Sequence, residues 1–269
     1  MLCSQRALLS LFPIRRSVGL ALLCILTSCA TGEKEQDSYR AELHLQIGTS
    51  LMSQGQYPRA MAELLKAQEL DPKNPVVQNN LGLSYLVRGR LKEAEQHLRK
   101  AVELNPKYTE ARNNLGRILL DEHKYTEAAK ELKLAALDLT YPNPASPLAN
   151  LGEAYFALKQ YSLARKTLAE SIRYRRENCS AVTYYGRSLF ELKQYAPASQ
   201  ALDEAVRICN PELQQEPYYF SSLSHLQNGN LDMARSRWKE SLENCPRGKY
   251  AGAIRNLMKS RNEGTVGPQ

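Results

Sequence analysis

The sequence is dominated by small residues that return at a nearly constant interval. Glycines recur every 34 or 36 residues, at Gly48, Gly82, Gly116, Gly152 and Gly186, and Ser222 continues the series. A second small residue follows twelve positions after each of these, at Ala60, Ala94, Ala128, Ala164, Ala198 and Ala234. A third follows seven positions later, at Ala67, Ala101, Ala135, Ser171, Ala205 and Ser241. A period of this length is typical of a chain that stacks similar helical units.

The residues between the small positions explain how each unit would pack. A large apolar residue recurs among them, at Leu64, Leu98, Leu132, Leu168, Leu202 and Trp238. Small side chains allow two antiparallel helices to approach, and the large ones fill the space that is left. Gly55 and Gly89 fall between the two helices, where a tight turn needs a permissive backbone. Pro72 and Pro106 end the second helix, because the residue before proline disfavours the helical region.

This pattern resembles the tetratricopeptide repeat (TPR), which has 34 residues with small side chains at positions 8, 20 and 27. The resemblance implies an all-α fold: a TPR solenoid of six helix-turn-helix repeats over residues 41–246, about three quarters of the chain. Such units cannot bury their apolar faces alone, so stacking stabilises them. Residues 249–261 carry a stripe of apolar residues and are expected to form a C-terminal capping helix. The stripe comprises Tyr250, Ala253, Ile254, Leu257 and Met258.

The repeat is interrupted once, after the third unit. Pro142, Pro144 and Pro147 fall within six residues and favour an extended connection over a normal turn. We therefore expect units 1–3 in residues 41–139, then the proline-rich break and units 4–6 in residues 140–246, and the capping helix and tail in residues 247–269. The alternative is a tolerated two-residue insertion that has no role.

The N-terminus has the features of a secretion signal. Arg15 and Arg16 precede a short uncharged apolar run, which is far below the roughly 20 residues that span a bilayer. Leu26-Thr27-Ser28-Cys29 resembles a bacterial lipobox, which implies a signal peptide over residues 1–28 and acylation of Cys29. Ala30 follows, and by resemblance to known sorting rules this residue implies the outer membrane, with the chain on its periplasmic face. Residues 29–40 would be the lipidated cysteine and its tether. The alternative is a plain signal peptide with a chance cysteine.

The net charge argues against nucleic acid as a partner. Removing residues 1–28 takes away three arginines and no acids, which lowers the net charge from +8 to +5. Nucleic-acid proteins concentrate such charge on one face. The excess of positive charge here is mild, and we interpret these basic residues as lying on solvated helix surfaces.

Three cysteines remain after residue 29. Cys179 opens the first helix of unit five and Cys209 ends the second, so an antiparallel pair brings them within bridging reach. Export would favour oxidation. We expect a Cys179–Cys209 disulfide with Cys245 free, and three reduced thiols are the alternative.

The sequence offers no catalytic or metal-binding constellation. It contains no phosphate loop, HExxH, GxSxG or CxxC pair, and its four histidines are scattered. We expect a protein that is not an enzyme, with no cofactor, no metal and no small-molecule substrate.

TPR proteins bind ligands on the concave face of the first helices, and this family property indicates a groove on units 1–3. Its apolar floor and flanking amides suit a peptide with apolar anchors. The predicted groove residues are Leu45, Met52, Asn79, Asn80, Leu83, Leu86, Val87, Asn114, Arg117 and Leu120.

The lipobox, six repeats, the YPNPASPLANLG break and the late cysteines together resemble the type IV pilus biogenesis lipoproteins PilF, PilW and Tgl. That resemblance implies a pilotin: an outer-membrane lipoprotein that binds secretin subunits and promotes their localisation and multimerisation. The alternative is an envelope TPR adaptor for a peptidoglycan enzyme or another secretion system.

Overall fold

The computed structural model describes residues 35–210 and 215–263, and it is built from paired antiparallel helices. The first helix covers residues 35–53 of the described part. The following helices are α2 (Tyr57–Leu70), α3 (Pro75–Val87), α4 (Leu91–Leu104), α5 (Thr109–Asp121), α6 (Tyr125–Ala136), α7 (Ala145–Ala157), α8 (Tyr161–Tyr174), α9 (Cys179–Glu191), α10 (Tyr195–Ile208), α11 (Glu216–Gln227), α12 (Leu231–Asn244) and α13 (Ala251–Glu263). The all-α solenoid predicted from the sequence is confirmed.

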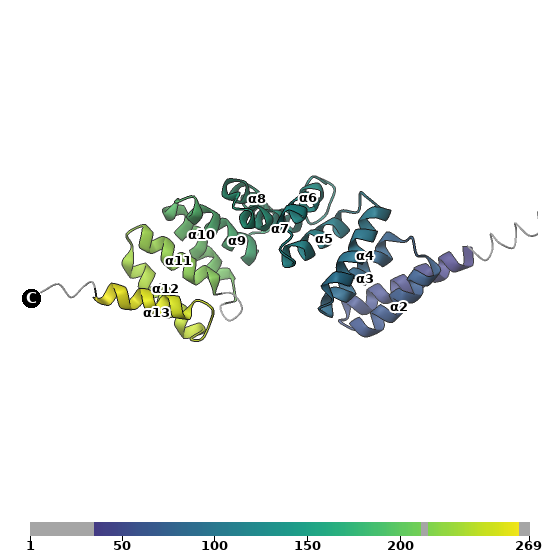
Figure 1. Cartoon of the computed structure of the whole chain (residues 1–269), viewed down its shortest axis with the longest axis horizontal. Coiled ribbons are helices and arrows are strands. Elements are labelled where there is room, and N and C mark those ends of the chain that lie inside the picture. Colours follow the sequence, from purple (N-terminus) through teal and green to yellow (C-terminus); the bar gives the residue numbers. More distant parts are fainter. Residues whose placement is uncertain (1–34, 211–214, 264–269) are drawn as a thin grey trace, which may run out of the picture.

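The pairs follow one another in an arch (Figure 1). Helices α3, α5, α7, α9 and α11 contact one another in succession. In the central part of the arch they lie on its inner side, and α6, α8 and α10 lie outside (Figure 1). The first helices of the units therefore form the inner face of the array.

The repeated small residues pack as the spacing requires. Each repeated glycine lies against the large apolar residue of its partner helix; for example, a Cβ on Gly48 would come within 2.8 Å of the Leu64 side chain. Leu64 and its equivalents Leu98, Leu132, Leu168 and Leu202 are fully buried. Helix α13 closes the array, because its Ile254 packs with Ala234 and Trp238 of α12.

The turns inside the units use two different solutions. Gly55, Gly89 and Gly229 adopt φ angles of 72°, 72° and 79°. In units three to five the same place is taken by His123, Lys159 and Lys193, with φ near 60°. Left-handed backbone costs a non-glycine residue roughly 1–2 kcal/mol, so closure of these turns is driven by the packing of the flanking helices.

The connection between α6 and α7, residues 137–144, does not interrupt the stack, and Pro147 of the predicted break lies inside α7. Helix α7 packs against both α5 and α6. Asn150 of α7 donates a 2.9 Å hydrogen bond to the Asn113 side chain of α5. The repeat therefore continues across the break, which adds chain length at the edge of the array.

Candidate functional site

The inner face changes character between its two halves. The first helix of each unit carries the repeated glycine, which is replaced by Ser222 in unit six. Two residues before it lies an asparagine in units two to four (Asn80, Asn114 and Asn150) and an aromatic residue in units five and six (Tyr184 and Phe220). At the position immediately after it, the series is Leu83, Arg117, Glu153, Arg187 and Leu223. The N-terminal half is thus rich in amides, and the C-terminal half is aromatic and charged.

The amides of the N-terminal half bind one another. Asn80 donates to the Thr49 hydroxyl of the first helix at 2.9 Å, and Asn79 donates to Asn80 at 3.1 Å. Asn114 of α5 in turn donates to Asn79 at 3.0 Å. Asn79 and Asn80 are buried, so these amides hold neighbouring units together. The sequence predicts an open groove beside these amides, whereas their hydrogen bonds are internal.

The apolar residues predicted for this groove differ in exposure. Leu45 and Leu120 are each only 7% exposed and belong to the core. Met52 and Leu86 are half-buried and pack against core clusters. Leu83 is also half-buried, and Val87 (54% exposed) and Arg117 are exposed. The open part of the predicted groove is therefore confined to α3 and the adjacent surface of α5.

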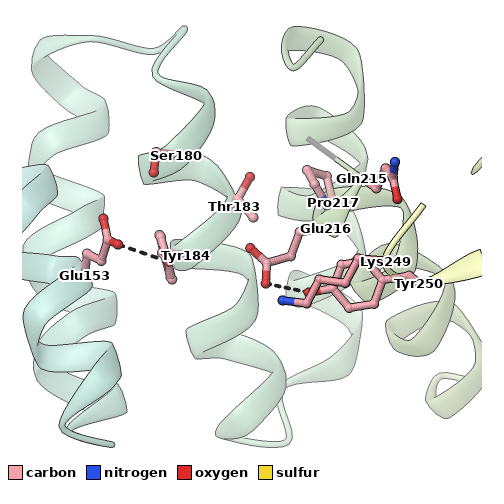
Figure 2. A pocket seen from close by; sticks show the side chains of 9 residues that line it. All are labelled: Glu153, Ser180, Thr183, Tyr184, Gln215, Glu216, Pro217, Lys249 and Tyr250. Atoms are coloured by element: carbon pink, nitrogen blue, oxygen red, sulfur yellow. Dashed lines mark hydrogen bonds between the residues drawn. The ribbon is translucent and has the colours of Figure 1, made fainter. Parts of the chain in front are cut away.

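The C-terminal half of the inner face is hollowed. A hollow of about 370 Å³ is lined by residues of α7, α9 and α11 and of the turn before α13 (Figure 2). Two further hollows adjoin it, one towards α5 and one towards the start of α7. Glu153 lines all three, so its carboxyl group lies where they meet.

Glu153 has a single hydrogen-bond partner among the described residues. The Tyr184 hydroxyl donates to Glu153 Oε1 at 3.1 Å (Figure 2). Burial raises the pKa of Glu153 above its ordinary value, and the neighbouring acids Asp121 and Glu216 add to the effect. Burial likewise raises the pKa of Tyr184, which therefore stays a neutral hydroxyl donor.

Arg187 fixes the wall of the hollow. Its guanidinium lies 4.3 Å from the ring centroid of Phe156 and 4.5 Å from that of Phe220. It also forms a 2.7 Å ion pair with Glu216, whose same oxygen accepts a 2.9 Å hydrogen bond from the Tyr250 hydroxyl. Burial, followed by the charge of Glu216, raises the pKa of Tyr250 to about 12. The charges of Arg187 and Glu216 are therefore satisfied by each other.

A disulfide holds one end of this wall. Cys179, the first residue of α9, is bonded to Cys209 at the end of α10, with their Cα atoms 5.2 Å apart. This is the pairing expected from the sequence, and Cys245 is a free thiol. Because the bridge joins the two ends of one helical pair, it fixes the start of α9, from which Thr183 and Tyr184 reach the hollow.

The described residues were compared with the requirements of a membrane-spanning helix and of a metal site. No helix among them is both long and apolar enough to cross a membrane. They contain no group of three side chains suited to hold a metal ion. Cys29 and the signal sequence lie outside the described residues.

Comparison with known proteins decides the family. The profile of the tetratricopeptide repeat matches residues 45–109, 79–147 and 149–212. The chain belongs to the tetratricopeptide repeat family. Its repeats are typical of protein-interaction scaffolds, and the matching family describes no enzyme. No curated protein matches the chain in sequence.

Solved structures show the same repeat architecture. PilF of Pseudomonas aeruginosa gives a TM-score of 0.72 at 21% identity, over 82% of this chain and 99% of PilF. PilW, a widely conserved type IV pilus biogenesis factor, gives 0.68 at 21% identity, over 80% and 97%. YrrB, a TPR protein with an unusual peptide-binding site, gives 0.59 at 18% identity, over 72% and 97%. The resemblance to PilF and PilW expected from the sequence is thus confirmed as a shared fold.

The groove predicted from the sequence lies on units 1–3, so the hollow around Glu153 was not expected. Tyr184, Arg187 and Tyr250 were missed as functional residues. A signal was present, because the residue two places before the repeated glycine changes from asparagine to tyrosine at Tyr184. The contribution of Tyr250 could not be read in this way, because it comes from the turn before the capping helix.

Proposed function

We propose that this protein is a pilotin of the type IV pilus: a lipid-anchored TPR protein that binds secretin subunits and promotes their multimerisation in the outer membrane. One observation carries the proposal. The chain matches PilF and PilW over about four fifths of its own length and nearly all of theirs. The lipobox at Leu26 to Cys29 supports the anchor.

The inner face supports peptide binding in this role. An array of stacked helical pairs presents an extended concave surface, and partners of such arrays are bound there. The surface offers exposed apolar contacts on α3 and a polar, aromatic hollow on α7, α9 and α11. YrrB, of the same fold, has a peptide-binding site. Together these features favour a segment of a secretin subunit lying along the inner face.

Deletion of the gene tests the proposal. The expected result is loss of heat-resistant secretin multimers from the envelope and loss of pili, with normal cell division. Complementation by the wild-type gene should restore both. Septation defects with normal secretin multimers would instead support an adaptor for a peptidoglycan enzyme. Normal multimers with a defect in another secretion system would support an adaptor for that system.

A further inference from the structure

The hollow on the inner face of units four to six contains one acidic group, Glu153, whose charge no described cation neutralises. Glu153 lies where three hollows meet, and its only hydrogen bond among the described residues comes from the neutral Tyr184 hydroxyl. No described cation lies within ion-pair distance of it. A partly buried carboxylate without a paired charge is costly, so this site lacks a partner cation among the described residues.

The other charged groups facing Glu153 are either engaged or lie at the edges, among them the exposed Arg175, which lines the hollow towards the start of α7. Arg187 of α9 is paired with Glu216 of α11 at 2.7 Å and is held between two rings. Arg117 and Asp121 lie on α5, one unit away, and they shift the pKa of Glu153 in opposite directions. His123, on the turn after α5, borders the adjacent hollow. Lys249 lies at the other end of the lining, over the Tyr250 ring (Figure 2).

The surroundings of Glu153 match a basic side chain. The Phe156 and Tyr184 rings lie 5.3 Å apart and line the hollow towards α5. The Arg187 guanidinium lies over both rings, and their remaining apolar surface gives an aliphatic stem something to pack against. A carboxylate beside such a surface is the natural partner of an ammonium or guanidinium group.

We propose that Glu153 anchors a lysine or arginine side chain of a peptide segment that lies along the inner face of units four to six. The inference rests on the proposed function only in assuming that this face holds a protein segment. The basic head group would pair with Glu153, and Tyr184 would keep the carboxylate oriented. The pairing supplies the charge that the free protein lacks, so recognition is selective for basic residues over neutral ones.

Selection from a random peptide library displayed on phage tests this. The targets are the full exported chain in mild detergent and its Glu153→Gln and Glu170→Gln variants. Glu170 is an exposed acid on the outer helix α8, so its variant removes the same charge outside the hollow. Peptides selected on wild type and on Glu170→Gln should be enriched in lysine or arginine at one fixed position. Peptides selected on Glu153→Gln should not. Peptides without a conserved basic residue, no convergent peptide, or the same basic peptides with Glu153→Gln would each overturn the inference.

A titration then measures the pairing itself. The peptide selected by wild type is synthesised with its basic residue and with norleucine in its place. The replacement should weaken binding to wild type about tenfold, or ~1.4 kcal/mol, and leave binding to Glu153→Gln almost unchanged. An equal loss with both proteins would contradict contact with Glu153. Helicity and thermal melting of each variant, measured in parallel, show whether it is folded.

The pH dependence gives a second readout. Only the ionised carboxylate pairs with a cation, so binding should weaken as the pH falls through the raised pKa of Glu153. The measurement uses a His123→Asn background, because the His123 ring also borders the hollow towards α5 and asparagine tolerates its left-handed backbone. Binding that is equally pH-dependent in Glu153→Gln would argue against the assignment. If these tests fail but deletion of the gene still removes secretin multimers and pili, only this inference is wrong and the pilotin proposal stands.

Discussion

Gly82 of α3 lies directly against Leu98 of α4, so closely that a Cβ at residue 82 would come within 2.7 Å of the Leu98 Cγ atom. We expect Gly82→Ala to destabilise the array by about 1–3 kcal/mol, because the added methyl group overpacks a site where Leu98 is fully buried. Gly252→Ala is the matched control, since nothing lies within 4 Å of that position in α13. Denaturant unfolding measures both. Equal stability of the two variants would show that the helices can move apart at no cost.

The disulfide gives a second prediction. Replacing Cys179 and Cys209 with serine should lower the free energy of unfolding by roughly 3 kcal/mol, because the bridge closes a loop of 30 residues. Cys245→Ser, which removes the free thiol, should have little effect. Thermal melting with and without reductant checks this. The prediction fails if reductant leaves the melting temperature of the wild-type protein unchanged.

These two predictions differ in how far the sequence alone supported them. The contact between Gly82 and Leu98 follows from spacing, because the same small and large residues return in every unit. The positive φ angles of His123, Lys159 and Lys193 could not be predicted from residue type, since these side chains disfavour that conformation and long-range packing imposes it. The burial of Asn79 likewise depends on a neighbour 35 residues away, Asn114. The hollow depends on curvature over several units, which no single repeat encodes.

Glu153 also predicts a pH dependence of stability. Its pKa is raised in the folded state, so the folded protein holds a proton that the unfolded chain releases, and stability falls as the pH rises from the ordinary glutamate value through the raised one. Glu153→Gln removes this penalty and can still accept the hydrogen bond from Tyr184. We expect it to raise the melting temperature by a few degrees at pH 7 and by less at pH 4. A variant that melts lower than wild type at pH 7 would contradict this reasoning.

The lipid anchor is tested at Cys29. Cys29→Ala should leave the chain unacylated and shift it out of the outer-membrane fraction. The effect should be large, because stable anchoring needs more than one acyl chain and all of them would be lost together. Fractionation and mass measurement of the mature N-terminus check this, with Cys245→Ser as a cysteine control. Unchanged fractionation with no acyl mass would remove lipidation from the proposed function.

The last prediction concerns the part of the inner face that holds the secretin. Leu83 and Val87 lie one turn apart on α3 and are partly exposed, whereas Leu86 between them packs against the core. We therefore expect Leu83→Asp with Val87→Asp to abolish secretin multimers while the array stays folded, because aspartate would have to be desolvated against an apolar segment.

The control for this pair must change charge and hydropathy equally. Leu65→Asp with Leu163→Asp does so on the second helices α2 and α8, where the two side chains are 37% and 48% exposed. A suitable charge control is Arg235→Glu, since Arg235 is partly exposed and pairs only loosely with Asp232 at 3.9 Å. Arg237 is unsuitable because its ion pair with Asp203 is largely buried. If the α3 double variant still forms multimers at the wild-type level while Glu153→Gln does not, the secretin contacts units four to six instead of α3.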